Sequence, residues 1–259
     1  MKIINVKKLT WLFWLFFSLP TLAANKQIAI VIDDIGNHQR DLEILSLPGK
    51  ISFSILPHTP YSQVFARLAS KSNKELLLHI PMQALDSSKA LGPGALTSNM
   101  SKEQLQITLG NALATLPQVK GVNNHMGSAL TQESLPMKWT MEVLKKRNLY
   151  FLDSRTTGLS QAQNVANLYG VENVGRHVFL DNIPNEKQLQ FRLNELKYKA
   201  ERYNFAIAIA HPYPETIEFL QRMLPELEQQ GFELVPLSQL VERKYIQLAQ
   251  AEHKGVGAR

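Results

Sequence analysis

Short apolar segments alternate with longer amphipathic segments along this 259-residue chain, and that alternation limits its possible folds most. Eight short segments are rich in aliphatic, β-branched or aromatic residues, as strands buried on both faces are: 28–32, 51–56, 75–78, 121–123, 149–152, 177–180, 205–210 and 232–235. Five longer segments have helical periodicity: 61–72, 101–116, 134–147, 186–202 and 214–230. This order predicts an α/β protein with a parallel sheet or barrel. Seven or eight such units in about 230 residues fit a closed or distorted (β/α) barrel, with an open doubly wound sheet as the alternative.

The first 23 residues have the layout of a secretory signal peptide. Lys2, Lys7 and Lys8 precede an apolar run of 11 residues, with small residues at a cleavage site after Ala23 or Ala24. That run is shorter than the roughly 20 residues of a membrane-spanning helix, although an uncleaved N-terminal anchor is an alternative. We therefore predict a signal peptide at 1–23, one domain at 24–246, a flexible C-terminal tail at 247–259, no membrane span after cleavage, and a periplasmic location.

Charge and cysteine content exclude several classes of function. Loss of the signal peptide removes three lysines and no acidic residue, which lowers the formal charge from +6 to +3. The remaining chain has no block of Lys and Arg with interleaved aromatic residues, so we do not expect a nucleic-acid partner. The sequence has 0 cysteines, which excludes thiolate chemistry and leaves His, Asp, Glu and water as possible metal ligands.

Polar side chains follow six of the predicted strands, at the ends where parallel α/β proteins gather their chemistry. They are Asp33-Asp34, His79, Asn123-Asn124-His125, Asp153-Ser154-Arg155, Asp181-Asn182 and His211. Any one of them has a simpler explanation, such as a helix cap, a buried core histidine or a residue that caps its strand. Together, imidazoles and carboxylates are typical of an open metal site, whose ion activates water and polarises a carbonyl. The set therefore predicts hydrolysis of an amide or an ester.

One connection is long for a compact domain. Residues 84–99 are rich in Ser, Gly and Pro and include Gly92-Pro93-Gly94. Long connections in compact domains are often functional lids, so we expect this segment to be one.

Five segments that span most of the mature chain carry a more specific pattern. They are residues 30–36 (IVIDDIG), 77–82 (LLHIPM), 121–128 (GVNNHMGS), 151–156 (FLDSRT) and 209–214 (IAHPYP). In this order they resemble the divergent polysaccharide deacetylase family, which is distantly related to the NodB-type carbohydrate esterases. The resemblance implies an α/β fold, a distorted (β/α)7–8 barrel of the polysaccharide deacetylase type. It also implies Asp33 as the general base, Asp34 as a metal ligand and His211 as the general acid.

The sequence departs from the better-known members of that group at one position. Those enzymes take two further ligands from a single His-x-x-x-His segment. If His79 occupies the first histidine position, Gln83 stands at the second. We therefore expect His125 to be the third ligand of a divalent metal, with Zn²⁺ as the expected ion.

The function that the resemblance implies is metal-dependent hydrolysis of a carbohydrate, specifically the deacetylation of an N-acetylated cell-envelope polysaccharide or peptidoglycan fragment. Asn124 or Arg155 would stabilise the oxyanion, and Asp153 and Asp181 would orient histidines or bind sugar hydroxyls. Two alternatives stay open. One is a metal-independent glycoside hydrolase that uses Asp33 and Asp153. The other is a non-catalytic envelope protein that binds a glycan or a protein partner on the same fold.

Overall fold

The computed structural model describes residues 26–256, so the predicted signal peptide lies outside the described residues. All the strands pair in parallel, in the order β6-β5-β4-β3-β2-β1-β8-β7, and β9 pairs with β1. The strands are β1 (Lys26–Ile35), β2 (Ser52–Ile55), β3 (Glu75–Met82), β4 (Gly121–Met126), β5 (Tyr150–Asp153), β6 (Asn173–Gly175), β7 (Val178–Phe179), β8 (Phe205–Ala210) and β9 (Phe232–Leu234).

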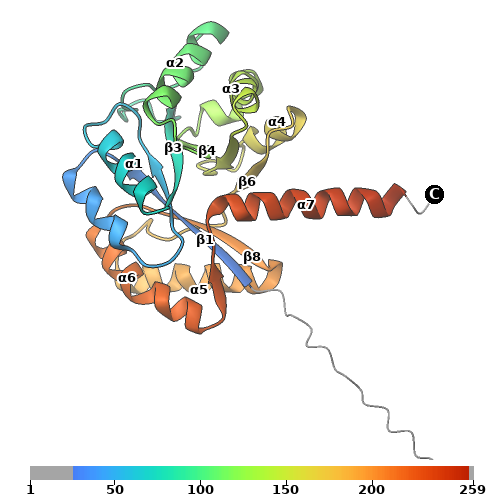
Figure 1. The fold of residues 1–259 in the computed structure, drawn as a ribbon. Helices are drawn as coiled ribbons and strands as arrows, with labels where there is room; N and C mark the ends of the chain where they lie inside the picture. Colours follow the sequence, from blue (N-terminus) through green and yellow to red (C-terminus); the bar gives the residue numbers. More distant parts are fainter. Residues whose placement is uncertain (1–25, 257–259) are drawn as a thin grey trace, which may run out of the picture.

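Helices flank this curled sheet (Figure 1). They are η1 (Gln39–Ser46), α1 (Ser62–Lys71), α2 (Lys102–Thr115), η2 (Leu130–Gln132), α3 (Ser134–Lys146), α4 (Ala162–Leu168), α5 (Glu186–Tyr203), α6 (Pro214–Gln229) and α7 (Leu237–Val256). Strands β6 and β7 are the two ends of the strand order and do not pair with each other within residues 26–256. The prediction of a distorted barrel is therefore confirmed: the sheet is an incompletely closed barrel that opens between β6 and β7.

Two layers of buried side chains follow the twofold alternation of each strand. On β1, Ile28, Ile30 and Ile32 pack in the larger cluster, which includes the buried faces of helices α1 to α6. Ala29 and Val31 point the other way and join a second cluster, which contains Leu77 of β3 and Ile207 and Ile209 of β8. This second cluster fills the inside of the curl. Any residue that continues the series 29, 31 on β1 therefore faces the inside of the barrel.

Helix α7 closes the amino end of the barrel. Its first turns bury Leu237, Leu240 and Val241 against the inner cluster, and its C-terminal part runs out from the body of the molecule (Figure 1). The segment 247–256, part of the predicted flexible tail at 247–259, is the continuation of this helix. None of the helices within residues 26–256 is long and apolar enough to cross a membrane.

Candidate metal centre and active site

Alternation along the strands decides which polar residues reach the inside of the barrel at its carboxyl end. Asp33 continues the inner series of β1, His79 follows Leu77 on β3, and His211 follows Ile209 at the end of β8. On β4, Val122 packs on the helix side, so Asn123 and His125 face inward while Asn124 faces the helices. The same rule places Asp153 on the helix side, because Leu152 belongs to the inner cluster.

The three predicted metal ligands converge on one point. Asp34 Oδ1 lies 3.0 Å from His79 Nε2 and 2.7 Å from His125 Nδ1. The two imidazole nitrogens are 3.2 Å apart. Within the residues that the structure describes, Asp34, His79 and His125 form the group of acidic and histidine side chains that could hold a metal ion. The structure thus brings together Asp34, His79 and His125, as the sequence predicts.

The geometry of the three atoms fits a small divalent cation. Asp34 Oδ1 is buried without an aligned hydrogen-bond donor, although two imidazole nitrogens lie close to it. Ligands about 2.0–2.1 Å from a tetrahedral zinc ion lie about 3.3 Å from one another, so the three atoms need to separate only slightly. One carboxylate and two imidazoles are also the donor types that a catalytic zinc site uses, with positions left for water or substrate.

Asp34 reaches this position because the backbone of β1 is irregular there. Its φ is 60°, and the register of β1 against β2 shifts between Ile32 and Ile35. Adjacent strand residues normally face opposite sides, but this irregularity directs the carboxylates of Asp33 and Asp34 toward the same histidine, with Asp33 Oδ2 3.7 Å from His79 Nε2. Burial disfavours ionisation of Asp34, yet the contacts with His125 and His79 outweigh it and hold the pKa of Asp34 well below its usual range.

Asp33 has the environment of a general base. Its side chain is 2% exposed, and burial raises its pKa above the ordinary value despite the opposing effect of His79. A raised carboxyl pKa brings the group closer to the working range of a base near neutral pH. The two adjacent carboxyls thus have pKa values shifted in opposite directions, which is consistent with two different roles.

His211 is held by Asp181 on the opposite side of the site. Asp181 accepts hydrogen bonds from the His211 backbone nitrogen at 2.6 Å and from Thr216 Oγ1 at 3.0 Å, and its Oδ1 lies 2.9 Å from His211 Nδ1. His211 Nε2 faces the site, 3.9 Å from Asp34 Oδ2. Burial alone would lower the pKa of His211, but Asp181, with smaller contributions from Asp34 and Asp33, raises it to about 9. A protonated imidazole directed at the site suits a general acid.

The remaining predicted residues lie outside this group. Asn124 is buried and uses its amide on the backbone, donating to Met126 O at 2.7 Å and accepting from Ser154 N at 3.0 Å. Asp153 accepts from Arg155 N at 2.8 Å and Ser160 Oγ at 2.9 Å, so it stabilises the connection after β5. The exposed Arg155 guanidinium donates to Gln163 Oε1. The contacts of these three residues shape the loops around the site, whereas Asp181 orients a histidine.

Two contributors received no role from the sequence. Asn123 contacts both Asp33 and His79, which the alternation of β4 could have indicated had the inner face been known. Arg176 crosses the opening between β6 and β7, where its guanidinium donates to Ser154 O at 2.7 Å and Arg155 O at 2.9 Å and stacks on Phe179. Nothing in the local sequence marks Arg176, because the turn that places it depends on strand pairing far away in the chain.

Gln83 fixes the long connection instead of facing the metal ligands. Its side-chain oxygen accepts from Ser98 N at 2.8 Å and Ser98 Oγ at 2.9 Å. Its backbone nitrogen donates to Leu96 O, and Leu96 N donates to Pro81 O, so segment 84–99 folds back along the end of β3. Gln83, the residue four positions after His79, therefore fastens segment 84–99 to the strand that carries His79.

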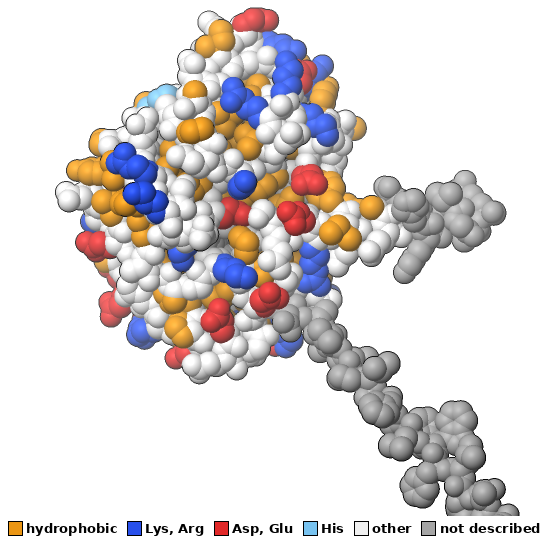
Figure 2. All heavy atoms as spheres, in the orientation of Figure 1, with side chains coloured by type: hydrophobic (Ala, Val, Ile, Leu, Met, Phe, Trp, Pro, Cys, Tyr) orange, Lys and Arg blue, Asp and Glu red, His pale blue; other side chains and the backbone are white. Residues whose placement is uncertain are grey.

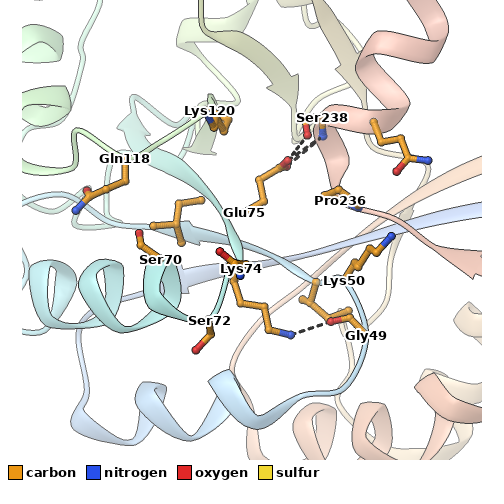
Figure 3. A pocket seen from close by; sticks show the side chains of 14 residues that line it. Gly49, Lys50, Ser70, Ser72, Lys74, Glu75, Gln118, Lys120, Pro236 and Ser238 are labelled. Carbon is orange, nitrogen blue, oxygen red and sulfur yellow. Dashed lines mark hydrogen bonds between the residues drawn. The ribbon is translucent and has the colours of Figure 1, made fainter.

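A hollow of about 710 Å³ lies at the opposite end of the barrel, at the starts of β2, β3 and β4 (Figure 3). Its central carboxylate, Glu75, already accepts from Tyr150 Oη at 2.8 Å and from the backbone and hydroxyl of Ser238. Lys74 Nζ donates to the carbonyls of Leu47 and Gly49. Basic and acidic side chains are interspersed on the face seen in Figure 2, so charge does not mark a second site there. We therefore assign this end to stability.

These features define a deacetylase-type barrel, and comparison identifies the family. The chain belongs to the divergent polysaccharide deacetylase family, whose sequence pattern matches residues 30–241. It is 38% identical to the uncharacterized protein YibQ of Escherichia coli (strain K12) over 214 residues, which is 82% of this chain and 66% of that relative, slightly under two thirds of its length. It is also 38% identical to an uncharacterized protein of Haemophilus influenzae over 207 residues, 78% of this chain and 74% of the relative.

Solved structures show the same fold. The uncharacterized protein ATU2773 of Agrobacterium tumefaciens C58 matches with a TM-score of 0.80 and 24% identity, covering 83% of this chain and 89% of that one. BA3943 of Bacillus anthracis, described as a CE4 family pseudoenzyme, matches with a TM-score of 0.50 and 16% identity, covering 84% of this chain and 66% of that one. At these identities the comparison establishes the fold.

Proposed function

We propose that this protein is a metal-dependent hydrolase that deacetylates an N-acetylated polysaccharide of the cell envelope. We further propose that it acts in the periplasm after removal of residues 1–23, and that Zn²⁺ is its metal. The observation that carries the proposal is the arrangement of Asp34, His79 and His125 around one point, with His211 Nε2 3.9 Å from Asp34. The family membership of the chain supports the substrate class.

The residues divide the work of hydrolysis between two sides of the site. A divalent ion held by Asp34, His79 and His125 would polarise the acetyl carbonyl and lower the pKa of water. Asp33, buried beside His79, accepts the proton of the attacking water. His211, protonated and held by Asp181, donates a proton to the leaving amine nitrogen. This division leaves the protein ready for a second cycle once protons have exchanged with solvent.

The test is acetate release from N-acetylated glycan oligomers and peptidoglycan fragments by the zinc-loaded chain, residues 24–259. We expect activity that a chelator abolishes and zinc restores. His211→Gln should retain zinc but lose about 10²–10⁴-fold in turnover, the usual contribution of a positioned acid. A wild-type protein that binds zinc and releases no acetate from any of these substrates would contradict the proposed activity.

A non-catalytic role is the second candidate, because Gln83 replaces the second histidine of the better-known motif and fastens a loop. A glycan-binding protein of this kind would bind the same oligomers without acetate release, and Asp34→Ala would leave that binding intact. The glycoside hydrolase alternative has less support. Both carboxylate oxygens of Asp153 are occupied by Arg155 N and Ser160 Oγ, so this residue is a poor partner for Asp33.

A further inference from the structure

Asn123, which received no role from the sequence, contacts both the proposed base Asp33 and the proposed metal ligand His79. Its side chain is 0% exposed and lies on the inner face of β4. Asn123 Nδ2 is 3.0 Å from both carboxylate oxygens of Asp33, and Asn123 Oδ1 is 2.8 Å from His79 Nδ1. Ser54 Oγ donates to the same Oδ1, and Nδ2 is 3.3 Å from Ser154 Oγ. One amide thus lies between the proposed base and a proposed metal ligand.

The surrounding groups fix which end of the amide points where. Asp33 is an acceptor when ionised, so it requires the NH₂ group of Asn123. His79 and Ser54 then face the carbonyl oxygen as donors. In the reversed orientation the amide oxygen would face the Asp33 carboxylate, which would set acceptor against acceptor with no hydrogen between them. The network therefore selects a single orientation of Asn123.

That orientation also sets the tautomer of His79. When His79 Nδ1 carries a hydrogen and donates it to Asn123, Nε2 has the free lone pair. His79 Nε2 is the atom that faces Asp34 and His125. Hydrogen bonds to the outer nitrogen of a metal-binding histidine commonly fix its ring and tautomer. Asn123 supplies this hydrogen bond through an amide, where a carboxylate or a backbone carbonyl often serves.

We propose that Asn123 is the positioning residue of this site: its carbonyl oxygen fixes His79 for metal binding, and its NH₂ group fixes Asp33 as the base. The inference rests on the proposed function for the role of Asp33, but its metal-binding half can be tested without a substrate. The two ends of the amide predict different effects for two substitutions. Asn123→Ala removes both contacts. Asn123→Asp keeps an acceptor for His79 but sets a second buried carboxylate against Asp33, which disfavours ionisation of the pair.

The experiment measures zinc affinity by competition with a chromophoric chelator, beside thermal unfolding and acetate release. Asn123→Ala should bind zinc about 10- to 100-fold more weakly than wild type, as loss of such partners usually does. Asn123→Asp should bind zinc more tightly than Asn123→Ala, and yet lose turnover at least as severely. The matched control is Asn173→Ala, because Asn173 is equally buried but bonds to Asn167, Val171 and Tyr245 away from the site.

The outcomes separate this inference from the proposed function. A folded Asn123→Ala protein with wild-type zinc affinity would overturn the positioning role but not the proposed function. The same holds if the control Asn173→Ala lowers zinc affinity as much as Asn123→Ala does. If Asn123→Ala does not fold, Asn123→Asp tests the proposal instead. Weak zinc binding with normal turnover in Asn123→Asp would contradict the assignment of the amide oxygen to His79 and of the NH₂ group to Asp33. A wild-type chain that binds no zinc would overturn the proposed function and this inference together.

Discussion

Replacement of Asp181 by asparagine should lower the pKa of His211, so that less of its imidazole is protonated and able to act as a general acid. Asn preserves the shape of Asp181 but has no charge. Its single amide oxygen can accept only one of the two hydrogen bonds that His211 donates to the two carboxylate oxygens, since an NH₂ group accepts none. Asp181 is the main cause of the raised pKa of His211, which is about 9. The rest of the increase comes from Asp34 and Asp33 and would persist in the variant.

The expected magnitude follows from the strength of a contact between opposite charges. Loss of such a partner changes a pKa by about 1–3 units, or about 1.4–4 kcal/mol of preference for the protonated imidazole. If the pKa of His211 fell to its ordinary value of 6.5, only about a tenth of the molecules would carry the proton at pH 7.5, compared with nearly all in the wild type. The alkaline decline of activity, expected near pH 9 in the wild type, should move to lower pH in Asp181→Asn.

The assay is an NMR titration of the metal-free protein labelled with ¹⁵N-histidine. His211→Gln, which lacks one signal, assigns the resonance. A wild-type His211 pKa near 6.5, or a raised pKa that Asp181→Asn leaves unchanged, would refute the reasoning that Asp181 prepares His211 as the acid. Asp181→Asn should also lower the rate of acetate release at pH 7.5 while zinc affinity stays near that of the wild type.

Two further predictions concern stability. Burial, with help from nearby cations, lowers the pKa of His177 to about 4, and its Nδ1 accepts a hydrogen bond from Ile207 N. Because an unfolded histidine binds a proton near pH 6.5, His177 should lower the free energy of unfolding by about 3 kcal/mol as the pH falls from 6.5 to 4. Chemical denaturation of His177→Gln over the same pH range should show a smaller loss. An equal loss in both proteins would contradict this prediction. Gly121→Ala would place a methyl group 2.3 Å from the Tyr150 ring, whereas the nearest atom at Gly110 in α2 is 3.9 Å away. Denaturation should therefore show about 1–3 kcal/mol of destabilisation for Gly121→Ala and about 1 kcal/mol of stabilisation for Gly110→Ala, and similar effects at both positions would be inconsistent with the packing described.

The strand pattern predicts the architecture because parallel strands carry their apolar sequence on both faces. The same property hides the inner face. Val122, Asn123 and Asn124 are consecutive buried residues of β4, and only pairing with β3 reveals that Asn123 belongs to the site and Asn124 to the helix side. Prediction therefore reached the right strand ends, but the choice between neighbouring residues needed the three-dimensional register.

Short elements escaped prediction for a related reason. Strand β6 has three residues and α4 has seven, too few for strand and helix periodicity to be distinguished. Arg176 lies directly after β6, between β6 and β7. The left-handed backbone at Asp34 is also not evident from sequence, since an aspartate tolerates but does not require a positive φ. That conformation turns the second carboxylate toward the histidines.

Metal content of the purified chain, residues 24–259, tests the central claim most directly. Elemental analysis should find about one equivalent of zinc in the wild type after reconstitution. The Asp34→Ala/His125→Ala double variant should remain folded and lose that metal, since two of the three converging ligands are gone. A wild-type protein without metal after reconstitution with zinc, or a double variant that retains a full equivalent, would contradict the assignment of the site.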